Sequence, residues 1–537
     1  MPTLQRTDSC TDIAFTLRRQ FHKNEFRYAE STELKGELSG PYLSLSHGRI
    51  SAITLFTANS VPSRPYQREI IEAALSGHDV YVQAATSFGK SLCFQLPAVI
   101  DPGSNNHSRF SSVEPYGTID TTLAGQMCPQ LTSKQINQVE ALRASGIDAS
   151  SLNSNTPYPE KDRIQRDLET GHPRTPLLYV TPELCSGSRF RERLRLVHKQ
   201  KELARIAIDE AHCISEWGHD FRKDFKRLSW FRETFPDVPI MCLTATANAQ
   251  VREDVLRILK LDETPERIKS FLMSPQRQNL HIEIRYFKDE DDNRLADFLK
   301  WIRAVHDRRR AEPRRKELRD AGERPESVPG IIYTLSRDEC ETLAASLREE
   351  GIGARPFHAK LSKEVKLETL SRWINNEPGY DIIVATTAFG MGIDKNNVRF
   401  VVHWRIPKSF EGYYQEAGRA GRDGNASYCF LYYSREDLER VMRMVRSDSK
   451  EGTNQEARLH SLHSLATYCE SVDSCRHADI CKYFGETAVP DCDFACDWHK
   501  DAYDLETRYL KGLASPDWVS TQVQQGTYDA YDYYEED

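Results

Sequence analysis

Residues 79–96 decide the fold class, and they read Asp79-Val80-Tyr81-Val82-Gln83-Ala84-Ala85-Thr86-Ser87-Phe88-Gly89-Lys90-Ser91-Leu92-Cys93-Phe94-Gln95-Leu96. The first five residues form a short run rich in Val and Tyr, which predicts a buried strand. The last residues carry the apolar pattern of a helix. Between them, Gly89, Lys90 and Ser91 fit the phosphate-loop consensus G-x-x-x-x-G-K-[ST], although Ala84 replaces its first glycine. This order predicts an α/β domain that binds a nucleotide.

The loop offers the groups that bound phosphates require. Backbone N–H groups at a helix N-terminus hold phosphate oxygens, a lysine reaches the β and γ phosphates, and a hydroxyl binds magnesium. A bare Gly-Lys-Ser is usually a surface turn, so a second motif must support the assignment. We expect ATP and Mg²⁺ as cofactors, with contacts from Thr86, Ser87, Phe88, Gly89, Lys90 and Ser91.

The second motif lies in residues 203–222. The apolar run 203–208 predicts a strand, so Asp209 and Glu210 emerge at its carboxyl end, where open α/β sheets bind ligands. One acid can hold magnesium together with Ser91, a role we give to Asp209, and the other can orient water. Alone, the acids could be a solvated turn. Beside the phosphate loop they predict ATP hydrolysis, with Lys90, Asp209 and Glu210 as catalytic residues.

Length, charge and cysteine usage limit the class of protein. A chain of 537 residues corresponds to about three or four domains. The net charge of -8 argues against a wholly basic nucleic-acid-coating protein, but it allows a local basic groove. Thirteen cysteines without an N-terminal signal region favour a reducing intracellular compartment. No apolar run approaches the ~20 residues of a membrane span, so we expect a soluble protein with no membrane partner.

Several ordered motifs from Arg64 to about His499 resemble the RecQ family of superfamily 2 DNA helicases. They include residues 63–67, 181–183, 213–222, 243–247, 385–395 and 415–424. The resemblance implies two RecA-like doubly wound parallel-sheet lobes of class α/β, over residues 61–270 and 271–445. A small helical zinc-binding subdomain follows over 446–505. Residues 1–60 receive no role, and 506–537 form an acidic tail expected to be disordered.

The resemblance also assigns residues to roles. Arg64 and Gln67 belong to an adenine-reading element, and Asp394 contacts the ribose or an arginine. Arg419 and Arg422 are arginine fingers for the γ-phosphate, with Gln415 beside them. An aromatic-rich loop couples DNA contact to hydrolysis through stacking and phosphate contacts, by way of Trp217, His219, Phe221 and Arg222. Without the resemblance, Trp217 would more often be a core residue.

The function implied is an ATP-dependent 3′-to-5′ DNA helicase and translocase in recombination and repair. It would act on single-stranded and partly duplex DNA, in the nucleus of a eukaryote and otherwise in the cytoplasm. The alternative is a catalytically weakened or inactive DNA-binding relic, and an RNA helicase is a third option. No protein partner is predicted.

A cysteine-rich segment near the C-terminus predicts a zinc site. By resemblance, Cys475, Cys492 and Cys496 occupy ligand positions, and His499 falls where the family has a last cysteine. Three thiolates and one imidazole suit tetrahedral zinc, so we expect a Cys₃His structural site. Cys469 and Cys481 are the rival ligands, and buried thiols without metal are the alternative.

Two departures from the family affect these expectations. Residues 101–127 are polar and unpatterned where the family has an apolar strand, so we expect that strand to be missing and the segment replaced. After His499 no winged-helix domain is expected, which makes this a short form of the family. Both departures motivate the relic alternative.

Overall fold

The computed structural model describes residues 65–100, 121–126, 132–144, 146–217, 221, 223–289, 293–386, 389, 395–447, 454–486, 492 and 495–515. The chain divides into two compact units between residues 275 and 276. Among the described residues, no helix is both long and apolar enough to cross a membrane.

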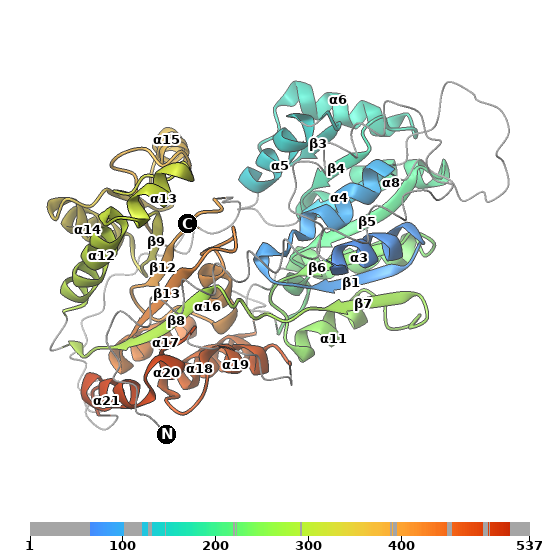
Figure 1. Cartoon of the computed structure of the whole chain (residues 1–537). Coiled ribbons are helices and arrows are strands. Elements are labelled where there is room, and N and C mark those ends of the chain that lie inside the picture. The colour runs from blue at the N-terminus through green and yellow to red at the C-terminus, as the bar shows by residue number, and fades with distance from the viewer. Residues whose placement is uncertain are drawn as a thin grey trace, which may run out of the picture. The chain divides into compact units, whose positions relative to one another are not determined.

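The first unit is built on a sheet with the strand order β3-β4-β2-β5-β6-β1-β7 (Figure 1), and its neighbouring strands run parallel. The strands are β1 (Asp79–Gln83), β2 (Thr121–Gln126), β3 (Ala149–Leu152), β4 (Leu177–Val180), β5 (Leu203–Asp209), β6 (Ile240–Thr244) and β7 (Ile268–Leu272). The helices are α3 (Pro65–Leu75), α4 (Lys90–Ile100), α5 (Thr132–Ala144), α6 (Tyr158–Glu169), α7 (Pro182–Cys185), α8 (Ser188–Lys199), α9 (Lys223–Lys226), α10 (Trp230–Thr234) and α11 (Ala249–Ile258), with short 3₁₀ turns η1 (Thr86–Phe88), η3 (Ala211–Ile214) and η4 (Arg227–Ser229).

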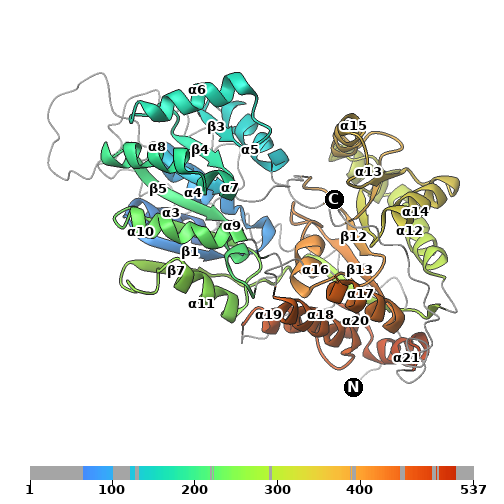
Figure 2. The ribbon, with the colours of Figure 1, turned by 180° about the vertical axis from the view of Figure 1, so that it is seen from behind.

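Side-chain alternation along these strands creates two cores. Val80 and Val82 of β1 pack with α3 and α4 on one face, whereas Tyr81 joins the core under α8, α10 and α11 on the other. Figure 1 shows α3 and α4 in front of the strands, and Figure 2 shows α10 in front from the opposite side. Because both faces are covered, β4, β5 and β6 are buried and mostly apolar, as expected for the interior strands of a parallel sheet. The predicted doubly wound fold is confirmed for this unit.

The prediction that a strand is missing from residues 101–127 is wrong. Thr121–Gln126 forms β2, which pairs in parallel with both β4 and β5 in the middle of the sheet. Its sequence, Thr-Thr-Leu-Ala-Gly-Gln, lacks the apolar run that marks the other central strands. Pairing on both sides supplies the context that strand propensity alone does not.

The second unit contains a parallel sheet with the order β10-β11-β9-β12-β13-β8. Its strands are β8 (Leu280–Tyr286), β9 (Gly330–Tyr333), β10 (Ala354–Phe357), β11 (Ile382–Ala385), β12 (Phe400–His403) and β13 (Ser427–Tyr433). Its helices are α12 (Arg294–Arg310), α13 (Arg314–Asp320), α14 (Arg337–Glu349), α15 (Lys363–Ile374), α16 (Phe410–Ala417), α17 (Arg435–Ser447), α18 (Gln455–Glu470), α19 (Arg476–Tyr483), α20 (Asp497–Lys500) and α21 (Ala502–Gly512).

The two faces of this sheet also carry separate cores. Helices α12 and α14 cover one face, and α16 and α17 cover the other. The C-terminal helices α18, α19 and α21 share the core of the second face, through side chains such as Leu462, Ile480 and Leu505. The predicted second lobe is therefore present, and the C-terminal helical segment packs directly on it.

Candidate nucleotide and metal sites

The phosphate loop follows β1 without interruption. Thr86, Ser87 and Phe88 form η1, Gly89 adopts a left-handed conformation with φ of 84°, and Lys90 and Ser91 begin α4. The Lys90 Nζ donates hydrogen bonds to the carbonyl oxygens of Ala84 at 2.8 Å and Ala85 at 3.3 Å. The loop thus curls around its own lysine at the N-terminus of a helix, where anions bind.

Gln67 holds this loop from α3. Its Nε2 donates to the carbonyl of Phe88 at 2.7 Å and to that of Gly89 at 3.4 Å, and its side chain is buried. A Cβ on Gly89 would lie 2.7 Å from the same Nε2, which is closer than real contacts allow. The predicted adenine contact of Gln67 stays a prediction, because here its amide nitrogen binds the loop. Arg64 lies outside the described residues.

The acidic pair lies at the same edge of the sheet as the phosphate loop. Strand β6 separates β5 from β1, and all three strands run parallel, so their carboxyl ends are about 10 Å apart at the usual strand spacing. Asp209 ends β5 and is buried, and its Oδ1 accepts from the Glu210 N–H at 3.0 Å. Glu210 is left-handed, with φ of 54°, a conformation that is uncommon for residues other than glycine.

A buried histidine connects the acids to the next strand. The Nδ1 of His212 lies 3.6 Å from the Glu210 carboxylate and 3.0 Å from the Thr244 hydroxyl at the end of β6. The Thr246 hydroxyl lies 3.5 Å from the same nitrogen. The sequence predicts no role for His212, although the run Asp-Glu-Ala-His contains it. Its partners Thr244 and Thr246 lie in the segment 243–247, which the family resemblance already marks as a motif.

The described part of the aromatic loop presents the large side chain of Trp217 to solvent. Trp217 is 41% exposed, which argues against the alternative that it is a core residue. Its backbone N–H donates to the Ser215 hydroxyl at 3.1 Å, and Phe221 is half-buried. His219 and Arg222 lie outside the described residues.

The two arginines follow α16 in the second unit. Arg419 is buried and Arg422 is half-buried, as is Gln415 within the helix. Burial raises the pKa of the Tyr333 hydroxyl, and the nearby Arg419 partly opposes this rise. Asp394 lies outside the described residues.

Glu416 fixes α16 to the adjacent strand. Its carboxylate lies 2.9 Å from His403 Nε2 at the end of β12, and both side chains are buried. The helix that leads into the two arginines is therefore tied to the sheet.

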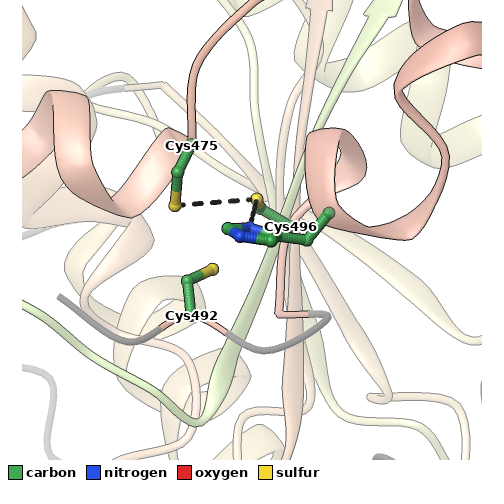
Figure 3. A group of neighbouring side chains, drawn as sticks. Cys475, Cys492 and Cys496 are labelled. Atoms are coloured by element: carbon green, nitrogen blue, oxygen red, sulfur yellow. Dashed lines mark hydrogen bonds between the residues drawn. The ribbon is translucent and has the colours of Figure 1, made fainter. Parts of the chain in front are cut away.

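The four predicted zinc ligands lie together in the second unit. The potential ligand atoms of Cys475, Cys492, Cys496 and His499 are all within 4.8 Å of one another. The Sγ of Cys496 is 4.0 Å from the Sγ of Cys475 and 3.4 Å from the Nδ1 of His499. Figure 3 shows the three cysteine side chains converging. A tetrahedron with Zn–S of about 2.3 Å and Zn–N of about 2.0 Å has edges of about 3.5–3.8 Å, so these residues fit zinc.

The rival ligands do not belong to this group. Among the described residues, the cluster of possible metal ligands contains the four residues above, and Cys469 and Cys481 are fully buried within α18 and α19. Burial raises the pKa of the Cys469 thiol. In the cluster, hydrogen bonds from Cys492 and Cys496 instead hold the pKa of the Cys475 thiol well below its usual range. Within the cluster, the neighbouring Cys475 raises the pKa of the Cys492 and Cys496 thiols, so Cys475 is the thiol that most readily becomes the thiolate that metal binding requires.

Buried contacts attach this cluster to β8. Arg476, next to Cys475, pairs with Asp497 at 2.9 Å, and both side chains are inaccessible to solvent. Asp497 also accepts from the Ile284 N–H at 2.9 Å, while the Ile282 N–H donates to the Ala495 carbonyl at 3.1 Å. The cluster thus completes the outer edge of the second sheet.

Family models match three successive parts of the chain. Residues 64–255 match the DEAD/DEAH box helicase model, 315–424 the helicase conserved C-terminal domain, and 435–500 the RecQ zinc-binding model.

Curated relatives match most of the chain. RecQ-like DNA helicase BLM of Xenopus laevis is 39% identical over 427 residues, which are 79% of this chain and 28% of the relative. ATP-dependent DNA helicase Q5 of Rattus norvegicus is 36% identical over 478 residues, 87% of this chain and 45% of the relative. ATP-dependent DNA helicase Q-like 2 of Arabidopsis thaliana is 37% identical over 435 residues, 81% of this chain and 54% of the relative. The chain thus spans about a quarter to a half of the length of these relatives.

Solved structures share the fold at low identity. The DUF1998 helicase MrfA bound to DNA has a TM-score of 0.55 at 15% identity, covering 84% of this chain and 60% of that one. The Mycobacterium smegmatis helicase Lhr, bound to single-stranded DNA and AMP-PNP, has a TM-score of 0.52 at 18% identity, covering 83% and 56%. At such identities the likeness concerns the fold alone.

Proposed function

The chain belongs to the RecQ family of superfamily 2 helicases, and on that premise we propose that it is an ATP-dependent DNA helicase. The proposal rests on one observation in the first unit: the carboxyl ends of β1 and β5 lie on the same side of the sheet. Strand β1 leads into the loop that ends at Lys90, and β5 ends in Asp209. A phosphate-binding lysine and a metal-binding acid at one edge are the requirements of phosphoryl transfer. The RecQ zinc-binding match favours a DNA substrate over RNA.

Hydrolysis of ATP would use these residues in distinct roles. Lys90 would exchange the carbonyls of Ala84 and Ala85 for the β and γ phosphates, since an ammonium group prefers anionic oxygens. Ser91 and Asp209 would hold Mg²⁺, which neutralises phosphate charge when bound. Glu210 would orient the attacking water.

The arginines after α16 would stabilise the charge that develops on the transferred phosphoryl group. In related enzymes such arginines contribute about 10³–10⁵ in rate. Arg419 and Arg422 are the residues assigned to this role, with Gln415 beside them.

The aromatic loop would transmit the effect of DNA binding to the site of ATP hydrolysis. The exposed ring of Trp217 supports base stacking, and the loop begins directly after His212, which contacts Glu210 and Thr244. Movement of the loop would therefore shift His212 and, through it, Glu210, the residue proposed to orient water. Translocation from 3′ to 5′, a role in recombination and repair, and location in the nucleus of a eukaryote follow from the family and belong to the proposal.

The cysteine cluster would hold a structural zinc ion. Cys475, Cys492, Cys496 and His499 provide four donors, so no position is left for a catalytic water. When bound, the ion would contribute to the free energy of folding and would link Cys492 to the N-terminus of α19 and to α20.

One of the two reasons for the alternative, an inactive DNA-binding relic, no longer holds. It assumed a missing core strand, but β2 is present between β4 and β5. The positions of Lys90, Asp209 and Glu210 at the same end of the sheet also support activity over a relic.

The proposal is tested by the ATPase rate with and without single-stranded DNA. We expect DNA to stimulate the wild type, and we expect Lys90→Ala to abolish hydrolysis because the phosphate contact is lost. Lys199→Ala, which removes an exposed lysine of α8 in the same unit, is the matched control and should behave as wild type. Negligible rates in wild type and Lys90→Ala alike would support the relic. Stronger stimulation by RNA of equal length would support an RNA helicase.

A further inference from the structure

Arg277 binds the turn that follows α16 and contains the two arginines. Its Nη1 donates to the carbonyl of Gly418 at 3.2 Å, and its Nη2 donates to those of Ala420 at 3.0 Å and Gly421 at 2.9 Å. These carbonyls belong to the turn that follows α16, which also lies near the negative end of the helix dipole. A buried guanidinium is well suited to this place, because its planar fork reaches several acceptors at once.

Asn279 holds the other side of the same turn. Its side-chain Nδ2 donates to the backbone carbonyls of Gly421 and Asn425, both at 2.9 Å. Its backbone carbonyl accepts from the Ser427 N–H at 3.0 Å. The Nε of Arg277 donates to the Asn279 Oδ1 at 3.3 Å, so the two side chains act together.

Gly421 shows how closely the turn is fitted to this pair. It adopts a left-handed conformation with φ of 56°, and a Cβ at this position would lie 2.4 Å from the Asn279 Nδ2. The Gly421 carbonyl accepts from both Arg277 and Asn279. The backbone between Gly418 and Asn425 therefore has little room to shift while the pair is in place.

We infer that Arg277 and Asn279 are positioning residues for the arginine fingers, an inference that rests on the proposed role of Arg419 and Arg422. Arg277 binds the carbonyls on both sides of Arg419, those of Gly418 and Ala420. A catalytic group must be held near its productive position before the reaction, and a displacement of about 1 Å can lower a rate about 10²-fold. The pair fixes the backbone from which the fingers extend, without contacting the phosphates itself.

The pair precedes β8 in the sequence, close to the division between the two compact units at residues 275 and 276. The same strand carries the zinc cluster through Ile282 and Ile284. The fingers, the pair and the cluster are thus joined within the second unit by one short stretch of chain.

The test is the steady-state DNA-stimulated ATPase of Arg277→Met, Arg277→Lys and Asn279→Ala in the full chain. We expect kcat to fall about 10- to 100-fold in Arg277→Met, with a smaller fall in Arg277→Lys, because an ammonium group reaches fewer carbonyls. The affinity for a fluorescent non-hydrolysable ATP analogue should stay near that of wild type. Arg294→Met is the matched control, since Arg294 is buried and binds the Trp404 carbonyl at 3.2 Å. It should lower the melting temperature without a selective loss of kcat.

Double variants separate positioning from general destabilisation. If Arg277 acts through the fingers, Arg277→Met should lower the kcat of Arg419→Ala by a smaller factor than it lowers that of wild type, because only Arg422 then remains to be displaced. Additive losses, or an unchanged kcat in Arg277→Met and Asn279→Ala, would overturn the inference. An unchanged kcat in Arg419→Ala alone would instead refute the proposed finger. Where Arg277→Met melts below the assay temperature, Asn279→Ala, which keeps the guanidinium, gives the same comparison.

Discussion

Gly89 carries the phosphate loop through a conformation that only glycine adopts without strain. Its φ is 84°, and the side chain of Gln67 closes the space where a Cβ would lie. A substitution would therefore strain the backbone and would also push the Gln67 amide away from the Phe88 carbonyl that it binds.

We predict that Gly89→Ala loses about 1–2 kcal/mol of stability from the left-handed backbone alone and also raises the KM for ATP. Gly77→Ala is the matched control, because Gly77 has a φ of 79° but no atom within 4 Å of its Cβ position. Denaturant unfolding should show losses in both variants, whereas only Gly89→Ala should alter ATP kinetics. A normal KM in Gly89→Ala would contradict the role of this contact.

Trp217 is the exposed aromatic residue that we assign to DNA contact. We predict that Trp217→Ala retains basal ATPase but needs about 5- to 150-fold more single-stranded DNA for half-maximal stimulation, since stacking is worth about 1–3 kcal/mol per base. Tyr158→Ala removes another exposed aromatic from the same unit and should leave the stimulation unchanged. An unchanged DNA requirement in Trp217→Ala would assign that ring to another role.

At the scale of elements, the zinc cluster and strand β8 form one structural unit. Cys475 and Cys496 are the N-cap residues of α19 and α20, and His499 lies within α20. Asp497, between Cys496 and His499, binds the backbone of β8. Loss of the ion should therefore release an edge strand as well as a loop.

We predict that His499→Ala lowers the zinc content below one equivalent and lowers the melting temperature, because structural zinc contributes directly to folding. His463→Ala, an exposed histidine of α18, should keep both values. Metal analysis and thermal unfolding measure the two effects. Stoichiometric zinc in His499→Ala would indicate a different fourth ligand.

Some strands could be predicted from their own sequence and others could not. Strands β1, β5 and β6 could be predicted because burial on both faces gives each an apolar run. Strand β2 could not, since its place depends on pairing with neighbours far away in the sequence rather than on its own polar residues. The same limit applies to Arg277, because the backbone carbonyls that it binds lie more than 140 residues away in the sequence.

Within the hydrolytic site, local motifs were predictable and long-range contacts were not. The sequence alone predicts Lys90, Asp209 and Glu210 as site residues, because each belongs to a short motif whose chemistry suits phosphate or metal binding. The contact of His212 with Thr244 spans 32 residues of sequence and arises from the adjacency of β5 and β6. Its importance follows from the fold alone.

At the scale of the whole molecule, the chain is acidic yet is proposed to bind a polyanion. A net charge of -8 disfavours binding by overall attraction, so phosphate contacts must be local. We predict that the DNA concentration for half-maximal ATPase stimulation rises steeply with salt, because local Lys and Arg contacts release counterions. Titrations at several salt concentrations measure the slope, and an affinity insensitive to salt would contradict electrostatic binding.

The central claim is that hydrolysis of ATP drives strand separation. It is tested most directly by a partial DNA duplex with a 3′ single-stranded tail and a fluorescent strand, mixed with the full chain and ATP. We expect wild type to release the labelled strand, Lys199→Ala to match it, and Lys90→Ala to release none. A duplex with a 5′ tail should stay intact. Equal release by wild type and Lys90→Ala, or none by wild type under conditions where DNA stimulates its ATPase, would contradict the account.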